Sequence, residues 1–504
     1  MKKIYILSIF LLFLQIVSAQ CWQSVNHGII HMLALKNDGT LWSCGNGALG
    51  SLGTGNTNNL SVPTQIGTSS NWQKFTCNYG TSFAIKTDGT LWSWGFNNNG
   101  QLGIGNFAQQ LSPTKVGFAT DWQNIKVNVR TTIGLKTNGS LWIWGDNDLG
   151  QVGDGTFQDR LSPIQIGLTS EWSKISADGN ATLAIKTDGT LWAWGDNTSG
   201  QIGDGTTINK NIPTQIGAAS DWSNIFSGYN CSYAIKTDGT LWAWGNNIKG
   251  QLGDGTVIDK HFPTQVGTAT NWKYISGREA ALGIKTDGTL WAWGLNSYGH
   301  FGNGNNTDSY IPIQIGNDTN WQKVLSTSVS TIAMKTDGTL WAWGYNSFGG
   351  VGNGTNINST IPIQIGIATN WESFSGNDLS FSAINSNDEL WSWGRNQFGQ
   401  LGINSFDDSN VPILVSCSNP LTNNTFTSSS EFSIFPNPAY KILNIQNSDN
   451  KIVEQIKIID LSGKTVLEQK PISNQIDVEK LQSGIYIIQI MSDGKSNVQK
   501  FSKQ

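Results

Sequence analysis

The stretch LWAWGDNTSGQIGDG, residues 191–205, decides the fold, because it recurs with small changes in eight copies along the chain. The period is 50 residues with a single step of 49, and all 23 tryptophans fall on it. The first set is Trp22, Trp72, Trp122, Trp172, Trp222, Trp272, Trp321 and Trp371. The second set is Trp42, Trp92, Trp142, Trp192, Trp242, Trp291, Trp341 and Trp391. The third set is Trp94, Trp144, Trp194, Trp244, Trp293, Trp343 and Trp393, with Cys44 in the first copy. Tryptophan placed this regularly indicates architecture before chemistry.

One copy, residues 171–217, has the pattern of four short strands. We expect them near residues 172–175, 182–186, 191–194 and 212–217. The fourth contains Pro213, which is tolerated in a strand at the edge of a sheet. The 58 glycines and the 13% of charged residues suit an all-β protein with many tight turns. Four strands repeated about every 50 residues predict the blades of a β-propeller.

Two local features of the repeat carry predictions about geometry. Asp188-Gly189 separates the second and third strands, and we expect both residues to take positive φ. The eighth copy has Asn387-Asp388 at this place, so its hairpin should be the least regular. In the Leu-Trp-x-Trp motif, we expect the leucine and one tryptophan on one face of the sheet and the other tryptophan on the opposite face.

Residues 1–19 have the features of a secretory signal peptide. Lys2 and Lys3 precede an apolar run from Ile4 to Val17, and Val17-Ser18-Ala19 is a small-residue cleavage site. The run is too short for a membrane anchor, and we find no other apolar segment long enough to span a bilayer. The net charge of −4 comes without a basic patch for nucleic acid. We therefore expect an exported protein without a nucleic-acid partner or an integral membrane segment.

Because we expect the protein to be exported, its five cysteines can form disulfides. Cys21 lies at the start of the first copy and Cys417 just past the last one. In a closed ring these two residues would meet, and we favour a disulfide between them over two ordinary buried thiols. Cys44, Cys77 and Cys231 have no pairing that the sequence supports. The odd total leaves at least one free thiol.

The stretches 191–205 and 241–255 resemble the regulator of chromosome condensation (RCC1) repeat, and similar motifs recur in all eight copies. The resemblance covers residues 20–417 and implies a β-propeller. Members of this family usually have seven blades. We favour eight blades here, because the first copy is complete, and the alternative leaves an end copy outside a seven-bladed ring. The nucleotide-exchange and chromatin roles of the founding member should not apply, because the even spacing leaves no room for an inserted element. Other similar propellers act by binding proteins.

Residues 432–504 form a second module after a polar linker at residues 418–431. Alternating apolar runs separated by Ser462-Gly463-Lys464 and Asp493-Gly494-Lys495 predict a small antiparallel β-sandwich. The segment resembles the type A C-terminal sorting domain of the type IX secretion system of Bacteroidetes. Its matching motifs are Phe435 to Pro438, Asp460 to Lys464, Ser483 to Tyr486 and Lys500 to Lys503. The resemblance implies passage through the outer membrane by the type IX machinery and removal of the tail, often with surface attachment. A plain accessory β-sandwich is the alternative.

The sequence contains no coherent catalytic or metal motif. His27 and His31 lack the glutamate and the helix of a zinc site, so we expect a structural or surface role for them. The Gly-Asp-Gly-Thr stretches lack a following helix, a phosphate-binding lysine or graded oxygen ligands, and turn chemistry explains them better. A catalytic site usually breaks repeat symmetry, and we find no such break. We expect no catalytic residue, bound metal or cofactor, and no enzyme.

Differences between copies gather in two segments. The loop after the third tryptophan carries Phe96, Asp146, Asp148, Tyr298, Tyr345, Arg395 and Phe398. The segment before the fourth strand carries Phe107, Phe157, Arg160, His261 and Tyr310. Aromatic and charged residues on variable loops of a rigid ring suit a recognition surface, and drift on unconstrained loops is the alternative. We name Phe96, Tyr298, Tyr345, Arg395 and Phe398 as candidate ligand-binding residues.

A ring of lysines is expected to be a solvated face that opposes edge pairing. Its members are Lys36, Lys86, Lys136, Lys186, Lys236, Lys285 and Lys335. Together these observations predict a secreted or surface-displayed propeller that binds a protein or polysaccharide without catalysis. The alternatives are a secreted polysaccharide-degrading enzyme on a propeller scaffold, which would need an asymmetric catalytic cluster in the central channel, and a purely structural adhesin.

Overall fold

The computed structural model describes residues 21–128, 130–168, 170–228, 230–417, 432–447, 453–460, 464–470, 475–492 and 495–503. The chain divides into two compact units, Met1–Asn419 and Pro420–Gln504. The expected signal peptide and linker lie outside the described residues. No helix within the described ranges is long and apolar enough to cross a membrane.

The first unit consists of eight four-stranded antiparallel sheets, each built from four consecutive strands. In repeats one to four the strands are β1 (Trp22–His27), β2 (His31–Lys36), β3 (Leu41–Gly45), β4 (Leu60–Gln65), β5 (Trp72–Asn78), β6 (Thr81–Lys86), β7 (Leu91–Gly95), β8 (Gln110–Lys115), β9 (Trp122–Val127), β10 (Thr131–Lys136), β11 (Leu141–Gly145), β12 (Arg160–Ile166), β13 (Trp172–Asp178), β14 (Ala181–Lys186), β15 (Leu191–Gly195) and β16 (Lys210–Gln215). In repeats five to eight they are β17 (Trp222–Ser227), β18 (Cys231–Lys236), β19 (Leu241–Gly245), β20 (Lys260–Gln265), β21 (Trp272–Gly277), β22 (Ala280–Lys285), β23 (Leu290–Gly294), β24 (Ser309–Gln314), β25 (Trp321–Ser326), β26 (Ser330–Lys335), β27 (Leu340–Gly344), β28 (Ser359–Gln364), β29 (Trp371–Gly376), β30 (Ser380–Asn385), β31 (Leu390–Gly394) and β32 (Ser409–Leu414).

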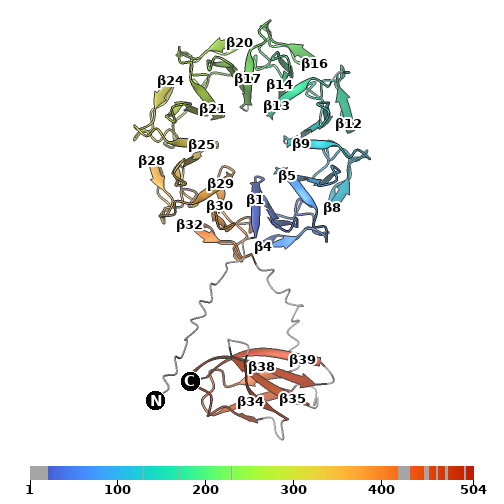
Figure 1. Cartoon of the computed structure of the whole chain (residues 1–504), viewed down its shortest axis with the longest axis vertical. Coiled ribbons are helices and arrows are strands. Elements are labelled where there is room, and N and C mark those ends of the chain that lie inside the picture. Colours follow the sequence, from blue (N-terminus) through green and yellow to red (C-terminus); the bar gives the residue numbers. More distant parts are fainter. Residues whose placement is uncertain are drawn as a thin grey trace, which may run out of the picture. The chain divides into compact units, whose positions relative to one another are not determined.

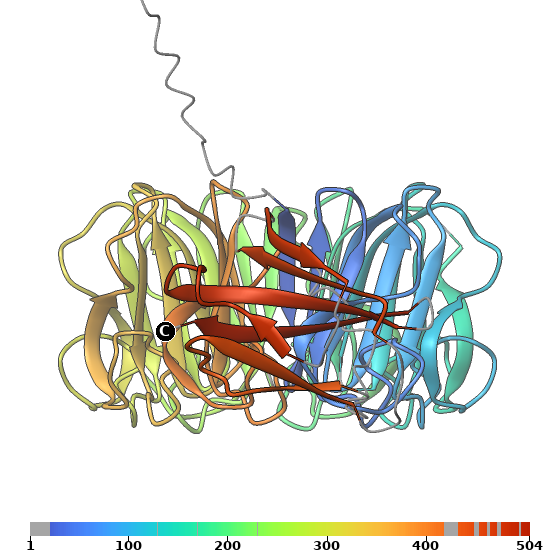
Figure 2. The same cartoon turned by 90° about the horizontal axis from the view of Figure 1, so that it is seen from below.

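These eight sheets are the blades of a ring, which confirms the eight-bladed propeller (Figure 1). The first strand of each blade lies innermost, and the fourth, proline-containing strand lies at the outer edge. Seen from the side, the connecting loops gather at the two faces of the ring (Figure 2). No blade borrows a strand from another repeat, so the ring must be closed by contacts between blades.

The hairpin between the second and third strands differs from the expected geometry. In the fourth repeat, Gly189 has φ +81° while Asp188 does not take positive φ, so only one turn position needs the left-handed region. Gly189 N donates to Lys186 O at 3.0 Å and Lys186 N donates to Thr190 O at 3.0 Å, the pattern of a type I turn with a glycine bulge. The eighth repeat keeps this pattern with Asp388 at φ +55°. Its hairpin therefore retains the regular hydrogen bonds with a non-glycine residue at the bulge.

The tryptophans of one repeat share a face of their sheet, contrary to expectation, because residues two apart in a strand point the same way. Trp172, Trp192 and Trp194 pack together against the preceding blade, while Leu191 and Ala193 face the following one. Their centroids lie 6.2 Å apart for Trp172–Trp192 and 5.8 Å for Trp172–Trp194. Each repeat except the first thus presents three indoles to one neighbour and a smaller apolar face to the other.

The third tryptophan also donates a hydrogen bond across the blade boundary. Trp194 Nε1 donates to Gln151 O of the preceding blade at 3.1 Å. Equivalent bonds connect seven blade boundaries. Gly153 has φ +81°, and a Cβ there would lie 2.7 Å from Trp194 Nε1. The repeated glycine therefore makes room for the indole of the next blade.

The lysine ring is not a solvated face. In all seven lysines Nζ lies between 3.7 and 5.3 Å from the centroids of two tryptophan rings, which is cation–π geometry. Side chains along a strand alternate between the two faces of the sheet. The lysine at the end of each second strand lies on the face that carries the tryptophans, opposite the face that carries the leucine. The lysines are therefore part of the packing between the first and second tryptophans.

The eighth boundary, between the last and first blades, keeps the backbone bond of the other seven boundaries but lacks the hydrogen bond of the third tryptophan. Trp22 N donates to Asp388 O at 3.1 Å, and His27 N donates to Ser375 Oγ at 3.1 Å. Here Cys44 replaces the third tryptophan, and its Sγ lies 3.7 Å from Gln400 O. A disulfide joins Cys21 to Cys417 across this boundary, with Cα atoms 6.1 Å apart and a sequence separation of 396. Cys44, Cys77 and Cys231 are buried and form no disulfide among the described residues.

The second unit contains two antiparallel sheets, as expected of a β-sandwich. Its strands are β33 (Phe432–Phe435), β34 (Ile442–Asn447), β35 (Gln455–Asp460), β36 (Thr465–Gln469), β37 (Gln475–Asp477), β38 (Gly484–Ser492) and β39 (Lys495–Lys503). One sheet has the order β33-β34-β37 and the other β36-β35-β38-β39. Both contribute to a single core that includes Leu443, Ile458 and Phe501, so this tail has a hydrophobic core of its own.

Candidate ligand-binding surfaces

Two kinds of loop lie at the same face of the ring. The turn between the first and second strands and the loop between the third and fourth strands follow the same end of an antiparallel sheet. Backbone hydrogen bonds connect them, since Tyr345 N donates to Val329 O and Arg395 N donates to Leu379 O, both at 2.9 Å. We call this the loop face, and most of the expected recognition residues lie on it.

Three neighbouring blades bring aromatic side chains and one arginine together on the loop face. The rings of Tyr298 and Tyr345 have centroids 5.3 Å apart, and those of Tyr345 and Phe348 are 6.2 Å apart. The guanidinium carbon of Arg395 lies 4.9 Å from the centroid of Phe348. Tyr298 is 41% exposed, and the other three are half-buried. We call these four residues the aromatic cluster.

The structure thus places three of the five candidate loop residues in contact with one another or with a shared neighbour. These are Tyr298, Tyr345 and Arg395. Phe398 occupies the place in the eighth repeat that Phe348 has in the seventh, but among the described residues it has no ring contact with the cluster. Phe96 belongs to the second repeat, away from these blades. The candidate set therefore divides into a cluster and two separate side chains.

The second variable segment supplies an outer rim. Phe107, Phe157 and Tyr310 are about half exposed, at 50%, 52% and 45%. Arg160 is instead paired with Asp154 in its own loop. Asp154 Oδ1 also accepts bonds from the N–H and the hydroxyl of Thr156, at 2.9 and 2.8 Å, which is the turn chemistry expected for these Gly-Asp-Gly-Thr stretches.

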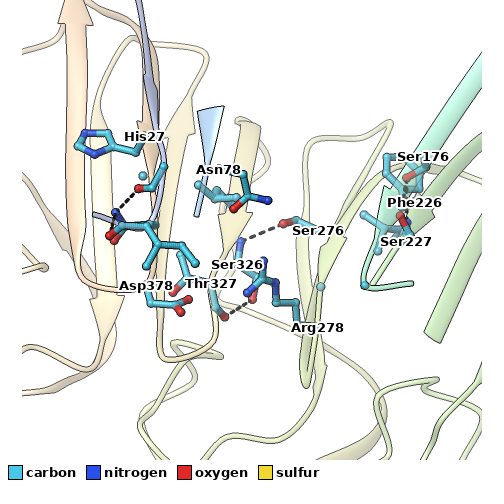
Figure 3. Close-up of a pocket in the computed structure, with 18 of the residues that line it drawn as sticks. His27, Asn78, Ser176, Phe226, Ser227, Ser276, Arg278, Ser326, Thr327 and Asp378 are labelled. Carbon is cyan, nitrogen blue, oxygen red and sulfur yellow. Dashed lines mark hydrogen bonds between the residues drawn. The ribbon is translucent and has the colours of Figure 1, made fainter. Parts of the chain in front are cut away.

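A cavity of about 460 Å³ is lined by the ends of the innermost strands. Its wall includes the hydroxyl groups of Ser176, Ser227 and Ser326 and the ring of Phe226 (Figure 3). The ring of Phe226 packs against that of Tyr274. The two rings have centroids 5.3 Å apart at an angle of 82°. The size is within the range of small-ligand pockets.

Charge in this cavity is concentrated on two blades. Arg278 Nη1 donates to Ser328 Oγ at 3.4 Å, and Ser328 N donates to Asp378 Oδ1 at 2.8 Å. Arg278 lies in the turn that is one residue shorter in the sixth repeat, where the spacing is 49 instead of 50. This break in the repeat spacing marks the turn at the cavity and is visible in the sequence.

His27 and His31 have structural positions at the boundaries of the first blade. His27 Nε2 lies 2.7 Å from Ser382 Oγ of the eighth blade, and His31 Nε2 lies 2.9 Å from Ser82 Oγ of the second. Burial, together with the charge of His31, lowers the pKa of His27 to about 3. Burial lowers the pKa of His31 to about 4. Both imidazoles are therefore neutral hydrogen-bonding groups at neutral pH.

Three carboxylates of the third repeat, Asp146, Asp148 and Asp159, offer oxygens within 4.8 Å of one another. Asp159 Oδ1 accepts the N–H of Asn147 at 3.0 Å, and Asp146 Oδ1 accepts the N–H of Asp148 at 3.1 Å. Arg130 Nη1 lies 3.5 Å from Asp146 Oδ2. Asp146 and Asp159 thus have partners within the protein, in loop hydrogen bonds and an ion pair.

Comparison with known proteins identifies the repeat. A model of the "Regulator of chromosome condensation (RCC1) repeat" matches residues 38–85, 88–127, 138–185, 188–235, 238–277, 287–332, 337–382 and 387–430, which is more than half of the chain. The chain belongs to the RCC1 repeat family. A second RCC1 repeat model matches residues 72–101, 172–201 and 222–251. The tail, residues 433–504, matches the "Secretion system C-terminal sorting domain", so this RCC1 propeller is a secreted protein exported by type IX secretion.

Solved RCC1 propellers have the same fold at low sequence identity. Human WBSCR16 is 19% identical with a TM-score of 0.54, covering 65% of this chain and 94% of its own. Prp20p from Saccharomyces cerevisiae is 20% identical with a TM-score of 0.54, covering 69% and 89%. Yeast Prp20 bound to Kap60 is 18% identical with a TM-score of 0.51, covering 83% and 88%. No curated protein matches the chain.

Phe348 is the member of the aromatic cluster that sequence reasoning missed. It stands two residues after the buried Asn346, as Tyr298 follows Asn296 and Phe398 follows Asn396. Aligning the RCC1 repeats on this asparagine places three aromatic residues at one position in consecutive repeats. The aromatic residue at this position of three consecutive repeats could be seen in the sequence. The contact between Phe348 and Arg395 could not, because it depends on how neighbouring blades are placed.

Proposed function

We propose that the ring is a non-catalytic binding module for an extracellular protein, and that the aromatic cluster on its loop face is the contact surface. The observation that carries this proposal is the row formed by Tyr298, Tyr345, Phe348 and Arg395 across three blades. Tyrosine and arginine are enriched among residues that dominate protein–protein binding, and a rigid ring limits the entropy lost on binding. Polysaccharide binding is the competing outcome.

Two further points support protein binding. Prp20p was studied for its binding to Gsp1p and histones, and yeast Prp20 was solved with Kap60, so propellers of this fold bind proteins. Outside this row, the same two loop positions carry other residues, such as Asn246 and Lys249 in the fifth repeat. Only part of the ring therefore presents a continuous aromatic surface. We further propose that residues 1–19 direct the first export step.

The test is a quantitative capture experiment with the full chain. The biotinylated protein is incubated with extracellular proteins of the producing bacterium, and captured proteins are measured by mass spectrometry. The triple variant Tyr298→Ala, Tyr345→Ala, Phe348→Ala should reduce capture of the specific partner at least about tenfold, which corresponds to ~1.4 kcal/mol. The control variant Asn246→Ala, Lys249→Ala changes the matching positions of the fifth repeat and should retain capture.

Equal capture by wild type and the triple variant would contradict the proposal. Capture that is abolished by periodate oxidation of the extracellular material, but not by removing its proteins with protease, would replace a protein ligand by a polysaccharide. Release of a modified small substrate during incubation would instead indicate an enzyme.

A further inference from the structure

One of the seven lysines packed on tryptophan differs from the other six in its electrostatic partner. Each of the six has an oxygen acceptor for Nζ. The acceptors are Cys417 O for Lys36 at 2.8 Å, Ser69 Oγ for Lys86 at 2.9 Å, Asp121 for Lys136 at 3.0 Å, Glu171 for Lys186 at 3.4 Å, Asp221 for Lys236 at 3.1 Å and Asp318 for Lys335 at 2.8 Å. Lys285 has no such acceptor among the described residues. Its Nζ lies 3.7 Å from the ring centroid of Trp291 and 4.8 Å from that of Trp272.

The missing acceptor follows from two sequence differences. Asp221, the partner of Lys236, is replaced in the sixth repeat by Asn271, and Asn271 Nδ2 donates to Asp287 Oδ2 at 3.0 Å. Asp318, the partner of Lys335, is replaced by Ala269. Both positions that supply a carboxylate elsewhere are therefore neutral here. Lys285 itself is only 8% exposed.

A cleft opens beside this ammonium group. It has a volume of about 370 Å³ and is lined by Lys285, Trp272, Trp291, Thr268 and Asp254, with apolar residues of the outermost strand β24 on one side. Trp291 is half-buried, so part of its indole faces the cleft. Asp254 is already paired with Lys260 at 3.1 Å, and Asp287 accepts bonds from Thr289 and Asn271. The cleft thus combines an ammonium group that has no oxygen acceptor among the described residues with indole and hydroxyl groups.

We propose that this cleft between the fifth and sixth blades binds an acidic sugar, with the carboxylate of a uronic acid residue on Lys285 and the sugar ring against Trp291. A buried ammonium without a hydrogen-bond acceptor is costly, and a ligand carboxylate would supply the charge-assisted hydrogen bond in place of the acceptors that the other repeats provide internally. A sugar ring presents an apolar C–H face to the indole and hydroxyl groups to Thr268. A simple anion or an acidic peptide side chain would use only Lys285 and leave the indole wall hydrated.

This site does not depend on the aromatic cluster, because it belongs to different residues and a different ligand. The fifth repeat supplies a matched comparison. Lys236 lies over Trp222 and Trp242 in an equivalent cleft of about 690 Å³, which also contains Asp204, but its ammonium is paired with Asp221. The two clefts share a lysine over two indoles, and they differ in volume and in whether the lysine is paired with a carboxylate of its own repeat.

The experiment is isothermal titration calorimetry of the full chain at low ionic strength, with trigalacturonate as the probe. Wild type should bind in one cleft per chain, and galactotriose and the tripeptide Glu-Glu-Glu should bind at least about tenfold more weakly, a difference of ~1.4 kcal/mol. Asn271→Asp installs the counter-ion of the fifth repeat and should reduce binding about tenfold or more. Asp221→Asn removes that counter-ion from Lys236 and should create a second binding site.

Thermal unfolding of each variant separates loss of the site from loss of the fold. Lys285→Met keeps much of the apolar stem and should abolish binding of trigalacturonate, whereas Lys335→Met should not. Unchanged binding by Asn271→Asp in a folded protein would overturn the proposal, as would equal affinity for galactotriose. Preferential binding of Glu-Glu-Glu would assign the cleft to an acidic peptide instead and would overturn it as well.

Discussion

Trp194 shows how much of the fold depends on single side chains. It is fully buried, packs against Trp172, and donates its Nε1 hydrogen to Gln151 O of the preceding blade. The sequence predicted that tryptophan would be architectural, because all 23 copies fall on the repeat. It did not predict that Trp192 and Trp194 share a face, although the period of two along a strand implies it. The bond to the neighbouring blade could not be predicted, because it depends on how the blades are stacked.

Replacing this indole tests its role directly. Trp194→Phe removes the inter-blade hydrogen bond and part of the buried ring, and should lower the free energy of unfolding by about 2–4 kcal/mol. Chemical denaturation followed by circular dichroism measures the change. Phe157→Ala removes an aromatic ring that is 52% exposed at the rim, and should cost no more than about 0.5 kcal/mol. Equal losses in the two variants would show that the lattice tryptophan has no special role.

The buried histidines of the first blade predict a pH dependence. The folded-state pKa values of His27 and His31 are about 3 and 4, below the unfolded value near 6.5, so the unfolded chain binds more protons between these limits. Stability should therefore fall as the pH is lowered from about 6.5 toward 4, by up to ~1.4 kcal/mol per pH unit for each histidine. His31→Gln should flatten this slope in urea titrations at several pH values. An unchanged slope would exclude His31 as its source.

At the scale of single elements, the hairpin turns and the contacts between blades differ from the geometry expected from the sequence. The Asp-Gly turns were predicted from sequence, but their backbone differs, since Gly189 takes positive φ and Asp188 does not. Asp-Gly occurs both in two-residue hairpin turns and in three-residue turns with a glycine bulge. The dipeptide alone therefore does not show which of the two turn types forms. The lysine ring was wrongly expected in solvent, because the pattern of one repeat gives no information about which face its neighbour covers.

The boundary between the first and eighth blades should be the weakest part of the ring without its disulfide. It has Cys44 instead of the third tryptophan, and Cys21–Cys417 closes a loop of 396 residues. Cys21→Ser should lower the free energy of unfolding by about 2–5 kcal/mol. Hydrogen exchange should accelerate first in β1 and β30, while β14 and β15 remain protected. Cys231→Ser, at a buried thiol outside the disulfide, is the control and should leave β1 unaffected. Uniform acceleration around the ring would contradict this assignment.

At the scale of the whole molecule, the repeat determines the ring and the differences between repeats determine recognition. Eight blades and the β-sandwich tail followed from periodic residues, which are local in sequence. Export by type IX secretion followed from the resemblance of the tail to a sorting domain. The cluster of Tyr298, Tyr345 and Phe348 joins residues from two neighbouring repeats, and Arg395 adds a third. The sequence shows that these residues lie in equivalent loops of consecutive repeats. The contacts between their side chains depend on how the blades are arranged in the closed ring.

Hydrogen–deuterium exchange of the full chain, with and without the captured extracellular protein, tests the central claim most directly. We predict that protection on binding is confined to the loop face of three adjacent blades, at residues 294–300, 344–350 and 394–399, while the equivalent loop at residues 244–250 is unchanged. Protection spread evenly over all eight repeats, or located only on the opposite face of the ring, would contradict the account.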